Sequence, residues 1–191
     1  MSENVSIPPV VRQATPDDLA QIVPLFIASH DTTLPGVTFS ADPWYAPDKV
    51  LQRLQTRLFP PQSLKTYVLE VPDTGEIVGY GNVKPRRDLE DTSSASHEQN
   101  SEDQDEVDMF FVKAGAGGRG YGTLLMEAIQ KDWHAQGGLK LRVLKRNERA
   151  IRFYEKCGFR MVAGGEEVVR SEALTEPMEE TLCLMRWSPT P

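Results

Sequence analysis

The stretch from Val107 to Ile129 constrains the fold of this chain more than any other part of the sequence. Residues 107–112 form a short run of mostly apolar and aromatic side chains, which is typical of a buried strand. Five glycines follow within residues 115–122, a density that no packed helix or strand tolerates. The next apolar residues keep the spacing of one helical face: Tyr121, Leu124, Leu125, Ala128 and Ile129. The sequence therefore predicts a strand, a glycine-rich turn and a helix start, whose free backbone N–H groups can bind an anion.

The glycines by themselves match more than one phosphate-binding motif. A P-loop is excluded, because no Gly-Lys-Ser or Gly-Lys-Thr follows them. The dinucleotide fingerprint G-x-G-x-x-G is matched by Gly115, Gly117 and Gly120, and Lys145 and Arg146 follow the next predicted strand, where an NADP enzyme can place cations. Only 71 residues follow Gly120, however, too few for the rest of a doubly wound domain and a substrate region. An NAD(P)-binding oxidoreductase is therefore a distant alternative.

Two segments carry a resemblance to a known family. Residues 117–122, Gly-Gly-Arg-Gly-Tyr-Gly, resemble the acyl-CoA motif Q/R-x-x-G-x-G/A, with Gly117 in the Gln or Arg position. Residues 147–159 resemble a second motif, N-x-x-A-x-x-F-Y-x-x-x-G-F. Both motifs are typical of the GCN5-related N-acetyltransferase (GNAT) superfamily, and here they stand in the family's order with a predicted strand between them. The resemblance is close from Glu106 to about Val162.

The resemblance implies a mixed α/β fold over residues 8–188. In the GNAT fold, a central and mostly antiparallel mixed sheet of about seven strands is splayed at strands 4 and 5 and flanked by about four helices. Local patterns agree with this expectation. They predict strands at 10–12, 66–71, 76–83, 139–144, 159–162 and 181–187, and helices that start near Thr15, Pro47 and Asn147, the second with Val50, Leu51, Leu54 and Leu58 facing inward.

The negative charge of the chain is concentrated in one segment. Residues 88–106 hold eight acidic side chains and no Lys or Arg, and without them the formal net charge of −7 would become +1. The rest of the chain thus lacks the basic footprint of a nucleic-acid-binding protein. The composition of residues 86–105 predicts a flexible loop, either a solvated linker or a device that attracts a cationic acceptor.

Compartment and assembly are predicted only in outline. No apolar run approaches the roughly 20 residues of a membrane helix, and the N-terminus lacks the basic and apolar regions of a signal peptide. Two cysteines, Cys157 and Cys183, make no disulfide framework. We expect a cytoplasmic, or alternatively nuclear, protein that is a monomer or a homodimer and does not bind membranes.

The resemblance also implies a cosubstrate, acetyl-CoA, and no metal. Amides of the glycine-rich turn would bind the pyrophosphate, and the backbone of the fourth strand would lie along the pantetheine arm. Asn147 matches the asparagine of the second motif, so both a cofactor contact and a helix cap are open to it. The residues expected to bind the cosubstrate are Phe110, Phe111, Val112, Gly117, Gly118, Arg119, Gly120, Gly122, Thr123 and Asn147.

The chemistry implied is direct attack of a primary amine on acetyl-CoA in a ternary complex. The acceptor is a small-molecule amine, a peptide lysine or a peptide N-terminus. Tyr154 stands where many family members place the acid that protonates the leaving thiolate, although it can also be a buried aromatic residue. Glu106, Asp108 or an ordered water would serve as the base, and Glu106 can instead simply end the acidic loop. A non-catalytic acyl-CoA-binding module remains an alternative.

A group of aromatic residues precedes the second predicted helix. Phe39, Trp44 and Tyr45 can form one wall of the acceptor pocket, or they can pack in the core under a loop. His30 is expected to pack or to cap a helix rather than to act in catalysis.

Overall fold

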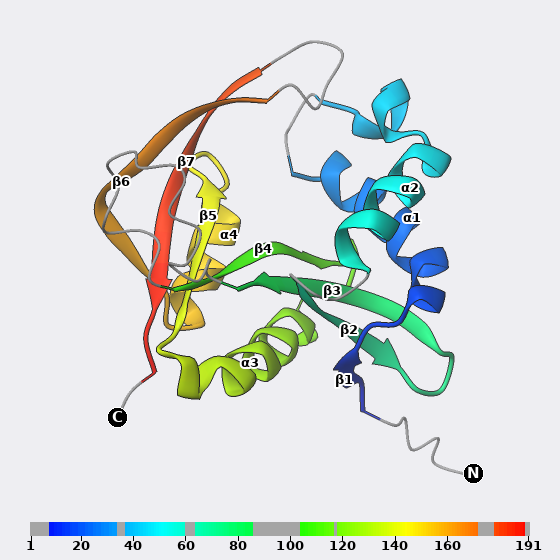
Figure 1. The fold of residues 1–191 in the computed structure, drawn as a ribbon, viewed down its shortest axis with the longest axis horizontal. Coiled ribbons are helices and arrows are strands. Elements are labelled where there is room, and N and C mark those ends of the chain that lie inside the picture. Colours follow the sequence, from blue (N-terminus) through cyan, green and yellow to red (C-terminus); the bar gives the residue numbers. More distant parts are fainter. Residues whose placement is uncertain are drawn as a thin grey trace.

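The computed structural model describes residues 8–33, 37–59, 64–85, 104–116, 118–171 and 178–189. A seven-stranded sheet with the strand order β1-β2-β3-β4-β5-β7-β6 forms its centre (Figure 1). The strands are β1 Val10–Gln13, β2 Lys65–Val71, β3 Glu76–Lys84, β4 Asp105–Val112, β5 Leu139–Leu144, β6 Arg160–Ser171 and β7 Met178–Trp187. The α-helices are α1 Leu19–Asp31, α2 Pro47–Leu58, α3 Tyr121–Trp133 and α4 Glu148–Lys156.

Strand direction decides between the predicted folds. Neighbouring strands are antiparallel throughout the described sheet, except that β4 and β5 run parallel. A doubly wound dinucleotide-binding domain is built on a mostly parallel sheet, so the topology contradicts that alternative. The expected mixed, mostly antiparallel sheet with four α-helices is confirmed.

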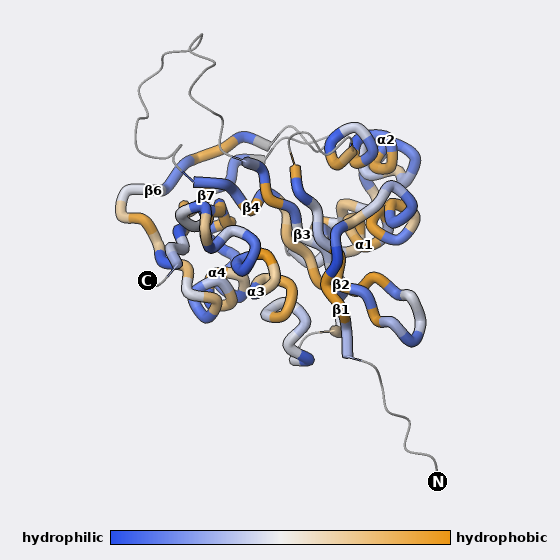
Figure 2. Tube along the Cα trace, turned by 60° about the horizontal axis from the view of Figure 1, so that its bottom comes forward, coloured by the Kyte–Doolittle hydropathy of each residue, from blue (hydrophilic) through white to orange (hydrophobic). Residues whose placement is uncertain are grey.

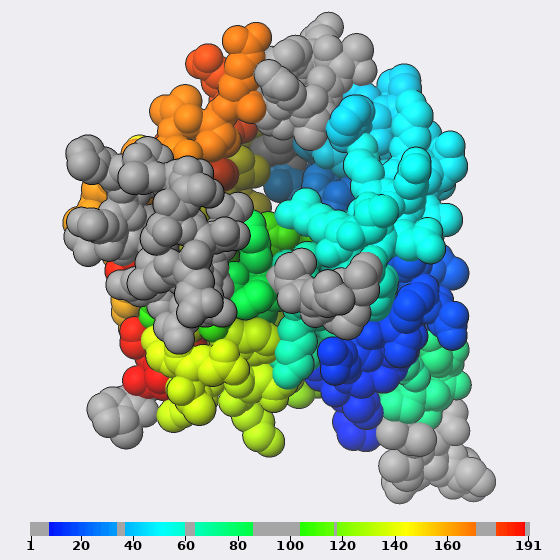
Figure 3. All heavy atoms as spheres, in the orientation of Figure 1, coloured from blue at the N-terminus to red at the C-terminus, as the bar shows by residue number. Residues whose placement is uncertain are grey.

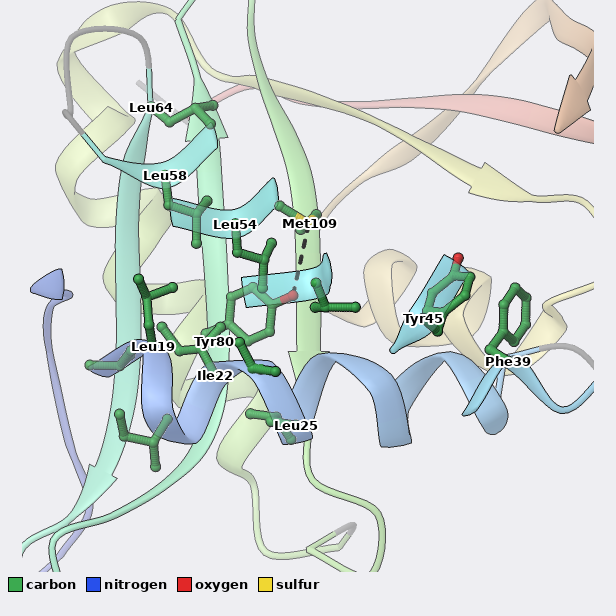
Figure 4. Packing of buried hydrophobic residues seen from close by; sticks show 14 residues of the cluster. Leu19, Ile22, Leu25, Phe39, Tyr45, Leu54, Leu58, Leu64, Tyr80 and Met109 are labelled. Atoms are coloured by element: carbon green, nitrogen blue, oxygen red, sulfur yellow. Dashed lines mark hydrogen bonds between the residues drawn. The ribbon is translucent and has the colours of Figure 1, made fainter. Parts of the chain in front are cut away.

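Helices cover both faces of the sheet. Figure 2 shows α1 and α2 on one side of β1–β4 and α3 and α4 on the other. On the first side, residues of α1 and α2 pack around Tyr80 of β3, as Figure 4 shows. We call this the α1–α2 cluster; among its buried members are Leu19, Ile22, Leu25, Phe39, Tyr45, Leu54, Leu58, Tyr80 and Met109. On the other side lies the α3–α4 cluster, with Val107, Leu125, Met126, Ile129, Trp133, Leu139, Leu141 and Phe159 among its buried members.

The sequence signals for helix starts were reliable. Before α1, the carboxylate of Asp18 accepts a hydrogen bond of 2.8 Å from the backbone N–H of Thr15. Two nitrogens of the Arg12 guanidinium donate to the same carboxylate, each at 2.8 Å, and these bonds hold the pKa of Asp18 below its usual value. Helix α2 begins at Pro47 as predicted, because proline fits the first helical position, where its missing N–H is not needed.

Two details of the predicted helices and strands were wrong. Leu51 is 40% exposed, because only Val50, Leu54 and Leu58 fall on the narrow stripe of α2 that meets the sheet. The last two strands were predicted only at 159–162 and 181–187, yet β6 continues to Ser171 and β7 begins at Met178. The outer residues of these extensions are solvated, with Val168 70% exposed, so no apolar alternation marked them as strand.

The end of the predicted acidic loop was also misplaced. Residues 86–103 lie outside the described residues. Asp105 was assigned to the loop, yet it is buried and opens β4 opposite Leu139 of β5. Gln104 next to it donates a hydrogen bond of 3.1 Å to the backbone oxygen of Gly137.

The packing of α3 against the sheet generates a stability prediction. Ile129 is fully buried, and its Cδ1 atom lies only 3.0 Å from the position that a Cβ atom would take on Gly81 of β3. Ile129→Ala should therefore lower the free energy of unfolding by about 2–5 kcal/mol in urea denaturation. Leu124→Ala on the exposed side of the same helix is the control and should cost only about 0.5 kcal/mol. Equal losses would show that Ile129 is not a core residue.

Candidate functional site

The parallel ladder between β4 and β5 is short. It joins three residue pairs, Asp105 with Leu139, Glu106 with Lys140, and Val107 with Leu141. Beyond Val107, β4 continues to pair with β3 as far as Val112, whereas β5 pairs with β7. One edge of β4 from Asp108 to Val112 therefore pairs with none of the described strands. Backbone N–H and C=O groups at such an edge are available to a ligand.

A β-bulge lies where the two strands part. Asn82 of β3 lies opposite Met109 of β4. The next residue of β3, Val83, lies opposite Val107, so Asp108 is an extra residue in β4. A bulge bends its strand and increases its local twist. The bend at Asp108 thus accounts for the divergence of β4 from β5 directly after Val107, the splay that was expected at strands 4 and 5.

The glycine-rich turn follows β4 and leads into α3. Gly118 and Gly120 have φ angles of +82° and +75°, which side chains rarely permit. Apart from their chain neighbours, none of the described residues comes within 4 Å of the position that a Cβ would take on either glycine, so a ligand can approach this backbone closely. Arg119 between them is exposed. Gly117 lies outside the described residues.

The start of α3 is packed against the end of β4 and against α4. A Cβ atom on Gly122 would lie 3.1 Å from Cε2 of Phe153 and 3.7 Å from Cγ2 of Val112. Glycine at this position therefore allows α4 to approach the turn. Thr123, the next residue, is exposed.

Asn147 caps α4. Its Oδ1 atom accepts a hydrogen bond of 3.1 Å from the backbone N–H of Ala150, and its own N–H donates to the oxygen of Leu144 at 2.8 Å. The cap is thus established by geometry, and a contact of Asn147 with a cosubstrate stays a prediction.

Tyr154 of α4 lies beside the open part of β4. Its ring centroid is 6.2 Å from that of Phe110, 5.3 Å from that of Phe153 and 5.8 Å from that of Phe159. Burial among these rings raises the pKa of Tyr154 well above its usual value, because the phenolate would lose hydration. The hydroxyl consequently keeps its proton at neutral and mildly alkaline pH.

The two candidate bases are both held by arginines. Asp108 Oδ2 accepts a hydrogen bond of 2.5 Å from Arg57 of α2, and Glu106 Oε1 accepts one of 2.6 Å from Arg142 of β5. The side chains of both acids remain partly exposed. Neither arginine was predicted from the sequence. The alternation of apolar and charged residues in 139–144 could have indicated Arg142, whereas no sequence pattern distinguishes Arg57.

The predicted catalytic residues do not form one connected group. Tyr154 packs in the α3–α4 cluster, whereas the partner of Asp108 comes from α2 on the other side of the sheet. Among the described residues, no hydrogen bond or ion pair joins Tyr154 to Glu106 or Asp108. Tyr154 thus comes from α4, whereas Glu106 and Asp108 both belong to β4.

The aromatic residues before α2 differ in burial. Phe39 and Tyr45 are buried in the α1–α2 cluster with His30, whose Nδ1 atom lies 2.9 Å from the backbone oxygen of Phe26. Burial lowers the pKa of His30, so the ring is neutral at pH 7 and packs as expected. Trp44, in contrast, is 47% exposed, with the Arg53 guanidinium 4.7 Å from its ring centroid.

Figure 3 shows a hollow between β6 (orange), α2 (cyan) and β4 (green), on the side where β4 and β5 diverge. A second hollow is lined by Glu127, Gln130, Lys131, His134, Ala135 and Trp187. Trp187 pairs with Leu139 at the opposite end of β5, so the second hollow is separate from the opening.

The described ranges contain neither a cluster of metal-ligating side chains nor a membrane-spanning helix. No group of three or more His, Cys, Asp or Glu side chains there could hold a metal ion. None of the helices in the same ranges is long and apolar enough to cross a membrane.

Comparisons with known proteins agree with this geometry. The model of the acetyltransferase (GNAT) family matches residues 32–159. No curated protein sequence matches. Similar solved structures include an acetyltransferase from Thermus thermophilus, with a TM-score of 0.64 and 18% identity over 96% of this chain and 98% of the other. A ribosomal-protein-alanine N-acetyltransferase from Brucella melitensis has a TM-score of 0.62 and 20% identity over 94% of this chain and 99% of the other. A spermidine N-acetyltransferase chimera from Vibrio cholerae has a TM-score of 0.62 and 16% identity over 95% of this chain and 96% of the other.

The contact between Gly122 and Phe153 can be tested without any ligand. Gly122→Val should lower the free energy of unfolding by about 1–3 kcal/mol, because the new side chain overlaps the Phe153 ring. Urea denaturation measures the effect. Thr123→Val, at the neighbouring exposed position, is the matched control and should change stability by about 0.5 kcal/mol or less. A Gly122→Val protein as stable as the wild type would mean that α4 does not press on the start of α3.

Proposed function

Because the chain belongs to the acetyltransferase (GNAT) family, we propose that it transfers the acetyl group of acetyl-CoA to a primary amine by direct attack in a ternary complex. One observation carries the proposal: an unpaired edge of β4 leads directly into a glycine-rich turn and the start of α3. An edge suits an extended chain such as pantetheine, and a helix start suits a pyrophosphate. The two features lie next to each other along the chain, as the two halves of CoA do.

The described residues fit this cosubstrate. Open space around Gly118 and Gly120 supports binding of the pyrophosphate by the amides of residues 117–123, with Arg119 as a further cation. The backbone of Phe110, Phe111 and Val112 would lie alongside the pantetheine arm. One of its N–H groups would polarise the thioester carbonyl, where negative charge develops as the amine attacks.

The acceptor must lose a proton before it attacks. We assign this step to Glu106 or Asp108, acting directly or through an ordered water. Each carboxylate already accepts a hydrogen bond from an arginine, Arg142 or Arg57, and each side chain keeps an exposed part. The arginines would orient the carboxylates while an ammonium group approaches.

Tyr154 would supply the proton that the leaving group needs. The amine nitrogen forms a bond to the carbonyl carbon, the carbon–sulfur bond breaks, and the thiolate of CoA takes the phenolic proton. The bonded nitrogen loses its surplus proton as the amide forms, and this proton restores the phenol. Burial raises the pKa of Tyr154, so the phenol is protonated at neutral pH, which is the form that this step requires.

The acceptor class stays broad within this proposal. A small-molecule amine, a peptide lysine and a peptide N-terminus all provide the required nitrogen. The structural neighbours named above include one protein named for ribosomal-protein alanine and one named for spermidine, so the shared fold does not choose between acceptors.

Ligand binding is the first experiment. Acetyl-CoA at 100 times its Kd should stabilise the protein by about 2.7 kcal/mol in thermal unfolding, and NADPH should not. A panel of amines, peptides included, should then identify an acceptor by release of free CoA thiol. Stabilisation by NADPH alone would overturn the proposal. Binding of acetyl-CoA without thiol release across the whole panel would favour a non-catalytic acyl-CoA-binding module.

The role of Tyr154 leads to a prediction about turnover. Tyr154→Phe keeps the ring and its packing, so the Kd for CoA should stay nearly unchanged while kcat falls by roughly ten- to a thousandfold. Single-turnover kinetics with the acceptor found above measure the chemical step. Tyr67→Phe is the control, because it removes a hydroxyl that hydrogen-bonds to Asp132 on α3; its kcat should match the wild type. An unchanged chemical step in Tyr154→Phe would reduce Tyr154 to a packing residue.

A further inference from the structure

Asn82 is a fully buried amide in the middle of β3. Its Oδ1 atom accepts a hydrogen bond of 2.9 Å from the backbone N–H of Met109. Met109 directly follows the extra residue Asp108, so this bond lies in the bulge where the regular ladder is interrupted. The Nδ2 atom of Asn82 has no hydrogen-bond partner among the described residues. Burial of an amide in an apolar core is costly, and the one bond that Asn82 makes there belongs to the bulge.

The bulge determines which face of the sheet each following side chain takes. Val107 and Phe110 pack in the α3–α4 cluster, whereas Met109 and Phe111 pack in the α1–α2 cluster. In a regular strand, side chains two positions apart share a face, so Met109 would lie on the same side as Val107. If Asp108 instead took a regular place in the ladder, without the bulge, Met109, Phe110 and Phe111 would each turn to the opposite face.

Other contacts hold the same point of β4. The hydroxyl of Tyr80, two residues before Asn82 on β3, donates to the sulfur of Met109 at 3.8 Å (Figure 4). Asp108 is paired with Arg57 from α2. Of these three contacts, only the one from Asn82 satisfies a backbone group that the bulge removes from the ladder, because the other two hold side chains.

We propose that Asn82 is a positioning residue, which maintains the β4 bulge and so holds the unpaired edge of Phe110–Val112 in place for the pantetheine arm of CoA. The inference rests on the proposed function, because it assigns that edge to CoA. Loss of the Oδ1 acceptor leaves the N–H of Met109 buried without a partner. This cost favours a regular ladder, in which the side chains of Phe110–Val112 lie on the opposite faces of the sheet. Asn82 thus acts through the backbone of β4 and does not itself touch the cosubstrate.

The test separates the two halves of CoA. Asn82→Leu keeps the approximate size of the side chain and removes the acceptor. Titration calorimetry should show the Kd for CoA raised about tenfold or more. The Kd for the adenosine diphosphate portion of CoA with its ribose phosphate, which lacks the pantetheine arm, should stay within about twofold of wild type, since the glycine-rich turn is not altered.

Two further variants complete the experiment. Asn82→Asp retains an oxygen acceptor and should restore the Kd for CoA to within about threefold of wild type. Thr66→Val is the matched control: Thr66 is buried opposite Asn82 on β2, and its hydroxyl has no partner among the described residues. This variant removes a neighbouring buried polar atom without touching β4, so its affinity for CoA should match the wild type.

Each result decides the inference. An unchanged Kd for CoA in Asn82→Leu would overturn it, and so would equal losses of affinity for CoA and for its nucleotide portion. If Asn82→Leu does not fold, Asn82→Asp becomes the test variant. A tenfold loss of affinity for CoA in folded Asn82→Asp, with the affinity for the nucleotide portion unchanged, would contradict the inference, because this variant retains the acceptor oxygen. Failure of the wild-type protein to bind CoA would instead refute the proposed function.

Discussion

The parallel pairing of β4 and β5 ends after Val107, and the candidate site depends on this interruption. If the ladder continued, the backbone N–H and C=O groups of Asp108–Val112 would form hydrogen bonds to β5 and would not be available to a ligand. The bulge at Asp108 prevents this, because one extra residue bends β4 while its other edge stays bonded to β3. The sheet therefore remains a single structure with an open edge inside it, supported by helices on both faces.

The two cores give this open edge a rigid setting with different chemistry on its two sides. On the α3–α4 side, Phe110, Phe153 and Tyr154 form an apolar ring group in which the phenol keeps its proton. On the side of α2, Asp108 is held in an ion pair with Arg57. The phenol in an apolar setting and the carboxylate in a polar one agree with the acid and base roles that we propose for them.

The sequence predicted those elements whose pattern is local. The strand at 139–144 and the helix from Pro47 to Leu58 were predicted with their observed bounds, because apolar spacing and a helix-start signal coincide there. The two glycine-containing motifs located the turn and Tyr154. The outer parts of β6 and β7 were missed, since a solvated ribbon has no apolar alternation. The bulge at Asp108 and the partner Arg57, 51 residues away in sequence, were also beyond reach, because pairing between distant segments sets them.

Amide hydrogen exchange with and without CoA reports on the backbone groups that the cosubstrate would occupy. We predict that saturating CoA slows exchange in two segments, the open edge of β4 at 110–112 and the start of α3 after Gly120. The outer hollow near Trp187 should show no change. Protection confined to that hollow, or none at 110–112 despite saturation, would contradict the assignment of the β4–β5 opening as the cosubstrate site.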